Sequence, residues 1–315
     1  MNNVYPLNCK MKKSSNKILD AASLIMNEPI TQEKDKAFLT RQLVQVTLPH
    51  SSPGNVPIWE RKNGNLSLSI RPGWDHENNQ PLGLPFGSIP RLLLFWITTE
   101  ALRTKNRTIM LGDNMSSFMR EIGLDPYTGG GKRGDGARLR NQMERLFRST
   151  ISFDIKSTEG SITKKKWLDM QIAPEGELWW DFKSPDQPTL FGSWIELGEK
   201  FYEAIISSPV PLDKRALSAL KRSPMALDLY SWATYKSFSL SHGKKREQFI
   251  TWKAFTVQLG SNYNDLKNFK RKIKNALKKV QSVYPSLDIE SVDGGFVIKA
   301  SRTSVIKQLS KRKII

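Results

Sequence analysis

The stretch Tyr263–Lys279, YNDLKNFKRKIKNALKK, decides how the second half of this chain folds. Its apolar residues recur every three or four positions, which is the spacing of one face of a helix. The same stretch carries seven Lys or Arg residues and a single acid, Asp265. The apolar positions are Leu266, Phe269, Ile273 and Leu277, continued by Val280 and Tyr284. We therefore predict an amphipathic helix that docks on a core and turns a basic face toward a polyanion.

The residues that follow this helix predict a β-hairpin. Leu287 and Ile289 alternate with polar residues, and Asp293-Gly294-Gly295 is a turn signal. Phe296 and Ile298 then alternate in the same way. A basic helix face can be no more than solvated surface. A helix followed by a hairpin is, however, the DNA-binding part of a winged-helix domain. This order of elements therefore favours a DNA-binding helix over a solvated surface.

The charge of the chain favours a nucleic-acid partner. The 315 residues include 49 Lys or Arg and 30 Asp or Glu, a formal net charge of +19. Residues 241–315 hold 17 of the basic residues and 5 of the acidic ones, so over half of the excess lies there. Nucleic acid is the first candidate partner and an anionic membrane the second. The longest apolar run, 92–97, is far shorter than the ~20 residues that span a bilayer, so we expect no membrane association.

A unit with the same order of elements is predicted upstream. Pro90 opens the apolar stretch RLLLFWITTEALRT, which predicts a buried central helix. A short strand, a short helix, a helix with one apolar face and a hairpin follow. Their expected ranges are 108–111, 114–122, 137–148, and 151–155 with 168–172, and a further strand is expected at 178–182. The same order recurs at 225–235, 250–252 and 253–259, ahead of the basic helix.

These patterns predict an α+β fold with two winged-helix domains in tandem. We expect residues 1–37 to form a flexible tail that includes a short helix near 18–26. Residues 38–201 would form the N-terminal winged-helix domain, which could also dimerise. Residues 202–222 would connect it to the C-terminal DNA-binding domain, 223–315. Further strands are expected at 43–48 and 66–70.

The predicted site is a set of basic residues. Some of them would clamp phosphates and others would reach guanine edges in the major groove. The candidates are Lys267, Lys270, Arg271, Lys274 and Lys278 on the basic helix, Lys299 on the hairpin, Arg138, Arg140 and Arg145 on the upstream helix, and Lys132 and Arg133 in the glycine-rich loop before it. The upstream helix has the thinner basic face, so it would either bind the other half of a DNA repeat or pack in a dimer.

The sequence lacks residues that the common enzyme and metal-site motifs require. A phosphate-binding P-loop needs Gly where Pro126 stands and Ser or Thr where Arg133 stands. The three histidines, His50, His76 and His242, are far apart and are expected in loops or at the surface, so neither a His-x-His nicking site nor a zinc site is predicted. One cysteine, Cys9, excludes an internal disulfide. We expect no catalytic residue, cofactor or metal.

Several longer motifs resemble the RepA-type replication initiators of bacterial plasmids. They are LPFGSIPRLLLFWITTEALRTKNRTIMLG at Leu84–Gly112, FMREIGL at Phe118–Leu124 and ARLRNQMERLFRSTI at Ala137–Ile151. LPHSSP and NGNLSLSIRPG, further upstream, are similar too, so the likeness covers about residues 40–300. In addition, YNDLKNFKRKIKNAL resembles the second winged helix of the wider iteron-binding class of initiators.

The resemblance implies a function and a set of partners. Such proteins bind short direct repeats in double-stranded origin DNA, help to melt the adjacent AT-rich DNA, and recruit the host replication initiator and replicative helicase. Many exist in a monomer–dimer equilibrium and repress their own promoter. The expected location is the bacterial cytoplasm, on nucleoid or plasmid DNA. Two alternatives stay open: a transcriptional repressor without replication activity, and an enzyme such as a nicking initiator or a primase.

Overall fold

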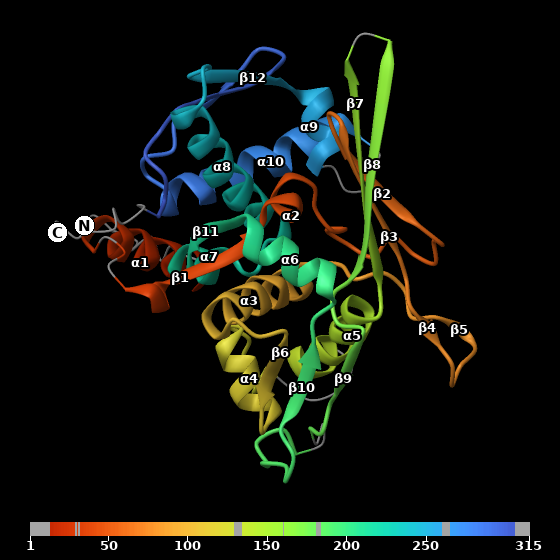
Figure 1. The fold of residues 1–315 in the computed structure, drawn as a ribbon. Coiled ribbons are helices and arrows are strands. Elements are labelled where there is room, and N and C mark those ends of the chain that lie inside the picture. Colours follow the sequence, from red (N-terminus) through yellow and green to blue (C-terminus); the bar gives the residue numbers. More distant parts are fainter. Residues whose placement is uncertain are drawn as a thin grey trace, which may run out of the picture.

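The protein folds as a mixture of helices and antiparallel sheets, which confirms the predicted α+β class (Figure 1). A computed structural model describes residues 13–28, 30, 32–128, 134–159, 161–180, 184–259 and 265–305. The helices are α1 Lys13–Asn27, α2 Arg41–Gln45, α3 Ser88–Thr104, α4 Met115–Glu121, α5 Asp135–Phe147, α6 Glu199–Ser207, α7 Lys214–Leu220, α8 Pro224–His242, α9 Trp252–Leu259 and α10 Leu266–Val283. The strands are β1 Lys36–Thr40, β2 Trp59–Asn63, β3 Leu66–Arg71, β4 Trp74–Asp75, β5 Gln80–Pro81, β6 Thr108–Gly112, β7 Thr150–Glu159, β8 Ile162–Gln171, β9 Glu175–Glu177, β10 Ser193–Glu196, β11 Pro209–Asp213, β12 Glu247–Thr251, β13 Ile289–Val292 and β14 Gly295–Lys299.

The C-terminal elements follow one another as predicted: α8, β12, α9, α10 and the β13–β14 hairpin. Strand β14 lies in the middle of a three-stranded sheet, between β12 and β13. The aromatic rings of Trp252 and Phe255 pack on Phe296 with centroids 4.5 and 5.7 Å apart, which ties α9 to β14. Gly295 allows β12 and β14 to approach closely, since a Cβ there would lie 2.1 Å from the carbonyl oxygen of Ile250.

The N-terminal elements also occur in the predicted order, but their strands pair differently from those of the C-terminal elements. Helices α3, α4 and α5 and the β7–β8 hairpin all form. The hairpin joins β3, giving the strand order β2-β3-β7-β8, whereas β6 pairs with β10. The reason is an apolar register in which Leu68 of β3 lies opposite Phe153 and Ile70 lies opposite Ile151, all buried. Residues 178–180 of the strand predicted at 178–182 do not form a strand, and the rest of it lies outside the described residues; β9 precedes it at Glu175–Glu177.

The segment that the sequence predicts as a flexible tail is partly docked on the body. The predicted short helix is present as α1, and its residues Ile18, Ala21 and Ile25 pack against the core. Helix α1 contacts α7 and α10, and burial of its apolar face accounts for the difference from a free tail. Residues 1–12 lie outside the described part of the chain.

Two further segments have a local structure that differs from the one predicted. Residues 43–45 of the strand predicted at 43–48 are instead the end of helix α2, which Thr40 caps by accepting a hydrogen bond from the Leu43 amide. Residues 46–48 form neither helix nor strand. The strand in this region is β1, which lies just before α2 and pairs with β11. Residues 202–222, predicted as a connector, contain most of α6 together with β11 and α7, and buried side chains from them join the core.

A buried ion network joins α3 to α8. The Arg91 guanidinium donates to both carboxylate oxygens of Asp228, at 2.7 Å each, and Nε2 of His50 lies 2.7 Å from one of them. Arg91 also donates to the carbonyl oxygens of Leu48, Pro49 and Gly87. Burial lowers the pKa of His50, whereas the pKa of Asp228 is lowered by Arg91 and His50 against the cost of burial. His50 thus lies in a loop, as predicted, but it is buried rather than at the surface.

Candidate nucleic-acid interface

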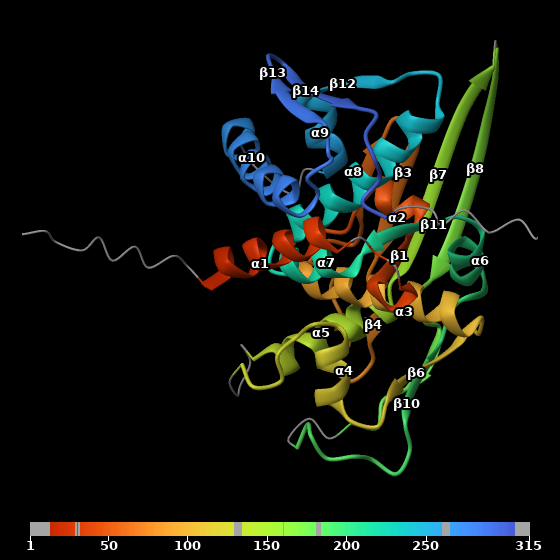
Figure 2. The same cartoon turned by 90° about the vertical axis from the view of Figure 1, so that its left-hand side faces the viewer.

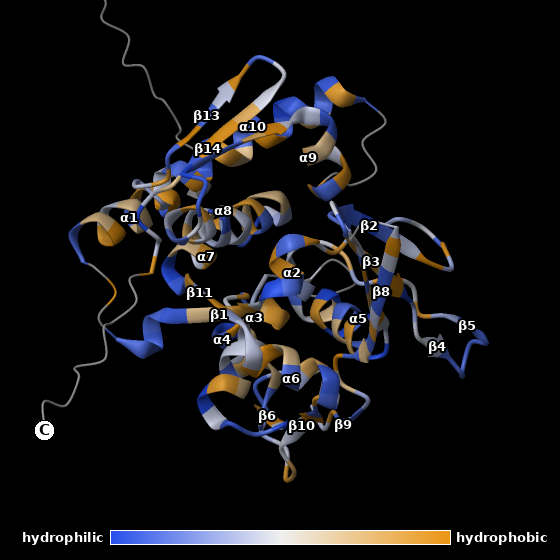
Figure 3. Cartoon of the chain, turned by 45° about the horizontal axis from the view of Figure 1, so that its top comes forward, coloured by the Kyte–Doolittle hydropathy of each residue, from blue (hydrophilic) through white to orange (hydrophobic). Residues whose placement is uncertain are grey.

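Helix α10 has the two faces that its sequence predicts. Asp265 caps its start, accepting hydrogen bonds from the amides of Lys267 at 2.8 Å and Asn268 at 3.3 Å. One face is buried against the C-terminal core by Phe269, Ile273, Ala276, Leu277, Val280 and Val283. Leu266 departs from the predicted stripe and is exposed, because it lies in the first turn, beyond the core. Figure 3 shows hydrophobic and hydrophilic residues side by side along α10.

The opposite face of α10 carries the predicted basic residues. Lys267, Arg271, Lys274 and Lys278 are exposed, and Lys270 is half-buried. The ammonium groups of Lys270 and Lys274 lie 5.3 and 5.7 Å from the centre of the Trp252 ring. Such cation–π contacts restrict the two side chains without neutralising them. The structure thus brings these five candidates together on one helix.

The hairpin places Lys299 near the end of β14. Its ammonium group forms an ion pair with Glu290 of β13 at 3.1 Å, and this hydrogen bond raises the pKa of Lys299. Lys299 stays positively charged, but a neighbouring carboxylate offsets part of its field. It is therefore a weaker candidate for a phosphate contact than the lysines of α10.

The predicted residues of α5 fall into two groups. Arg138 and Arg140 are exposed and pair with acids of their own helix, Asp135 at 3.0 Å and Glu144 at 3.5 Å. Arg145 instead turns toward the loop before α3, where it donates to the carbonyl oxygen of Leu84 at 3.3 Å. Burial lowers the pKa of Arg145. Thus Arg145 packs against the body rather than sharing the exposed basic face.

Gln142 of α5 takes part in the same packing. Its side-chain oxygen accepts a hydrogen bond from the amide of Phe86 at 2.8 Å, and the residue is buried. The sequence places Gln142 on the polar face with Arg138 and Arg145, but the loop before α3 covers that part of the helix. The two remaining candidates, Lys132 and Arg133, lie outside the described residues.

Helices α10 and α5 lie on the same side of the molecule. Figure 2 shows α10, α1 and α5 one below another along that side, with the β7–β8 hairpin on the opposite side. Helices α10 and α5 thus lie along one side of the molecule, with α1 between them. A long polyanion could contact both helices only by passing α1.

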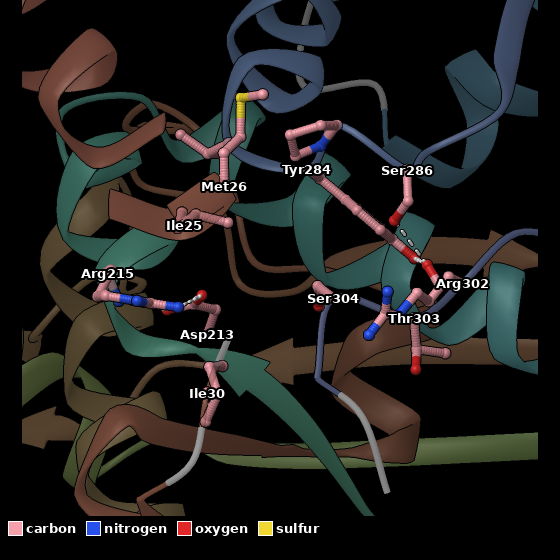
Figure 4. Close-up of a pocket in the computed structure, with 12 residues that line it drawn as sticks. Ile25, Met26, Ile30, Asp213, Arg215, Tyr284, Ser286, Arg302, Thr303 and Ser304 are labelled. Carbon is pink, nitrogen blue, oxygen red and sulfur yellow. Dashed lines mark hydrogen bonds and ion pairs between the residues drawn. The ribbon is translucent and has the colours of Figure 1, made fainter. Parts of the chain in front are cut away.

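A hollow of about 360 Å³ lies where α1, α7 and the end of α10 meet (Figure 4). On one side Arg215 pairs with Asp213 at 2.9 Å, and on the other Tyr284 and Ser286 donate to the carbonyl oxygen of Arg302. Ile25 of α1 contributes apolar lining. Several polar groups at this hollow thus bond to one another, and its position under α1 is that of a packing gap between elements.

Among the residues that the structure describes, no group of three or more His, Cys, Asp or Glu side chains could hold a metal ion. None of the helices in this part of the chain is long and apolar enough to cross a bilayer.

Comparison with known proteins identifies the family. The family described as "Plasmid encoded RepA protein" matches residues 84–254, more than half of the chain. The chain therefore belongs to the RepA family, the class of plasmid replication initiators that its sequence resembles. The strongly basic α10 follows the matched segment.

Two solved structures are also similar in part. Both contain domains 2 and 3 of RctB. The first aligns with a TM-score of 0.49 at 10% identity, covering 88% of this chain and 100% of that one. The second aligns with a TM-score of 0.45 at 11% identity, covering 80% and 95%. No curated protein matches the chain.

Proposed function

We propose that this protein starts plasmid replication by binding repeated double-stranded origin DNA through α10. The observation that carries the proposal is the division of α10 into a buried apolar face and an exposed face with five basic residues. Asp265, the single acid in this stretch, is used to cap the helix and lies at one end of the basic face. A helix held in this way can lie in a major groove while its flanking lysines contact phosphates.

The C-terminal elements would work as a winged helix, with α10 as the recognition helix and β13–β14 as the wing. Support comes from the element order and from the sheet in which β12 pairs with the wing strand β14. The N-terminal elements would form the second winged helix of a tandem, in a variant form whose hairpin pairs with β3. Helix α5 would then contact the other half of a repeat or pack in a dimer.

The further steps follow from membership of the RepA family. Binding at direct repeats would help to melt the adjacent AT-rich DNA and would recruit the host replication initiator and helicase. The protein would act in the bacterial cytoplasm as a monomer in equilibrium with a dimer. It would act by binding rather than catalysis, so purified protein should show neither magnesium-dependent DNA cleavage nor primer synthesis.

A nuclease footprint on the DNA that flanks the protein's own gene tests this proposal, with excess competitor DNA present. Regularly spaced protection over direct repeats is the expected result. Protection of a single inverted repeat at the promoter would favour a repressor without replication activity. A plasmid that carries the protected DNA and replicates only when this protein is supplied would separate the two functions further.

Substitutions on α10 identify the surface that binds. The double variant Lys270→Ala/Arg271→Ala removes two charges from the exposed face and should weaken origin binding by at least about tenfold. Its matched control is Lys244→Ala/Lys245→Ala, which removes two exposed charges from the loop between α8 and β12. Lys270 lies against the Trp252 ring, so its loss could weaken binding by disturbing the fold. Lys267→Ala removes a charge from the same face without a contact to Trp252 and should also weaken binding. Unchanged affinity of the α10 variants at physiological salt would rule out α10 as the recognition helix.

A further inference from the structure

The β7–β8 hairpin extends beyond the sheet to which it belongs. Strand β3 pairs with β7 from Thr150 to Ile155, so the part of the hairpin beyond Ile155 has only two strands. Within the part of the chain that the structure describes, no strand pairs with the other edge of β8. Figure 1 shows the hairpin projecting well past the helices that surround its base. Its distal half therefore contributes little to the core and is free to meet a ligand.

The projecting part of the hairpin is basic. Four exposed lysines lie within the five paired positions from Asp154–Trp167 to Thr158–Thr163, and Asp154 is the single acid among them. The lysines are Lys156, Lys164, Lys165 and Lys166. None of them forms an ion pair with an acid among the residues that the structure describes. Their field is thus not offset in the way that Glu290 offsets Lys299.

An exposed tryptophan accompanies these lysines. The indole of Trp167 has 70% of its surface exposed. Directly paired residues of antiparallel strands point to the same face of a sheet, and residues two positions apart share a face. Trp167 and its paired residue Asp154 therefore lie on one face with the Lys156–Lys165 pair. The opposite face carries Lys164 and Lys166 and continues the buried row of Ile151 and Phe153.

This combination fits an unpaired nucleic-acid strand. With Trp167 beside the Lys156–Lys165 pair, one base could stack on the indole while neighbouring phosphates contact the ammonium groups. Bases within a duplex are already stacked on each other and cannot use such a ring. Lysines on an edge strand also prevent edge-to-edge aggregation, but this purpose does not account for an exposed Trp167.

The hairpin lies away from the face proposed to bind duplex DNA. Figure 2 shows α10 and the hairpin on opposite sides of the body, with α8 and β3 between them. A duplex held on α10 would leave the hairpin uncovered. We propose that the β7–β8 hairpin is a separate binding site for single-stranded nucleic acid, in which Trp167 stacks on a base and Lys156 and Lys165 contact phosphates.

The test measures binding of a fluorescent oligothymidylate of about 16 nucleotides to the full-length protein by anisotropy. Trp167→Ala should weaken binding by about tenfold, which is typical for the loss of one stacked base. Lys156→Ala/Lys165→Ala should weaken it as well and should reduce its salt dependence. The matched control Lys244→Ala/Lys245→Ala removes the same charge from another exposed loop and should bind like the wild type.

A second set of measurements separates this site from α10. Binding of duplex origin DNA should be unchanged in both hairpin variants, and oligothymidylate binding should persist in Lys270→Ala/Arg271→Ala. Loss of oligothymidylate binding in the α10 variant alone would overturn the proposal and assign both ligands to α10. Failure of the α10 proposal would appear only in the duplex assay, so the two proposals fail independently.

Other outcomes also contradict the hairpin site. Wild-type affinity in both hairpin variants would do so directly. Binding of the wild type to vesicles with anionic lipid but not to oligothymidylate would assign the lysines to a membrane surface. If Lys156→Ala/Lys165→Ala retained oligothymidylate binding but gained self-association in sedimentation velocity, the role of the lysines would be to protect the β8 edge and not to bind nucleic acid.

Discussion

Arg91 of α3 and Asp228 of α8 are joined by two hydrogen bonds of 2.7 Å although 137 residues separate them in the sequence. Both side chains are buried, so the pair links the two halves of the chain inside the core. Removing one member leaves the other without a charged partner away from water. The Arg91–Asp228 pair therefore helps to hold the two halves of the chain together.

Asp228→Asn should lower the free energy of unfolding by about 3 kcal/mol, the usual cost of leaving one member of a buried ion pair uncompensated. Denaturant unfolding followed by circular dichroism measures the change. Asp20→Asn, the same chemical change at an exposed position of α1, is the control and should have almost no effect. Equal stability of the two variants would show that the Arg91–Asp228 pair does not hold the halves together.

Stability should fall as the pH is lowered through the range in which free histidine takes up a proton. The folded protein holds His50 with a pKa below its ordinary value of 6.5, because burial opposes its charged form. Unfolded His50 therefore binds a proton that folded His50 does not, and this stabilises the unfolded state below about pH 6.5. Unfolding curves between about pH 7.5 and 5.5 measure the slope. The slope should be smaller in His50→Gln; an identical slope would exclude His50 as its source.

Origin binding should weaken steeply with salt. If α10 and its neighbours neutralise about six phosphates, the logarithm of affinity should fall with the logarithm of salt concentration at a slope near ~−5. Removing one phosphate contact with Lys267→Ala should reduce that slope by about one. Fluorescence anisotropy across a series of NaCl concentrations gives both values. A slope close to zero would mean that the basic face of α10 does not meet phosphates.

Arg138 and Arg145 of α5 should respond differently to substitution by alanine. Arg145 donates to the Leu84 carbonyl and is half-buried, so Arg145→Ala should cost about 1 kcal/mol of stability. Arg138 is exposed, so Arg138→Ala should leave stability unchanged. If α5 contacts DNA in the monomer, Arg138→Ala should lower its affinity. Unchanged affinity would favour a structural or dimer role for this helix.

Gly295→Ala should destabilise the C-terminal sheet by about 2 kcal/mol, because its Cβ would lie 2.1 Å from the Ile250 carbonyl oxygen and would push β12 away from β14. Gly294→Ala is the comparison: its Cβ would meet only Phe249, at 3.6 Å, but its φ of +77° strains alanine by about 1 kcal/mol. Thermal unfolding should rank Gly295→Ala as the less stable. The reverse order would contradict this account of the close strand approach.

The sequence predicts the local features of this protein well. The two faces of α10, its hairpin and the buried α3 depend on spacing within one segment, and periodicity reports such spacing directly. The partner of β7 could not be predicted, since hydrophobic alternation shows which face of a strand is buried but not which strand lies beside it. Arg145 shows the same limit on the site, because the loop that covers it comes from Leu84, 61 residues away.

The buried network shows a second limit. His50, Arg91 and Asp228 are single polar residues in three separate segments, and no spacing connects them. Each one alone is typical of a surface, and only the fold brings their side chains together. Helix α1 differs from the predicted tail for a related reason: its short apolar face becomes stable only against α7 and α10.

The strand pairings bear on how this protein can be dissected. The segment that identifies the family, residues 84–254, begins after β3 and ends inside α9. It includes β7, β11 and β12, whose partners β3, β1 and β14 all lie outside it. A fragment cut at those bounds would expose three unpaired strand edges and the apolar side chains behind them, which invites aggregation. The part of the chain by which relatives are recognised is therefore not an autonomous folding unit, and biochemical work should begin with the whole chain.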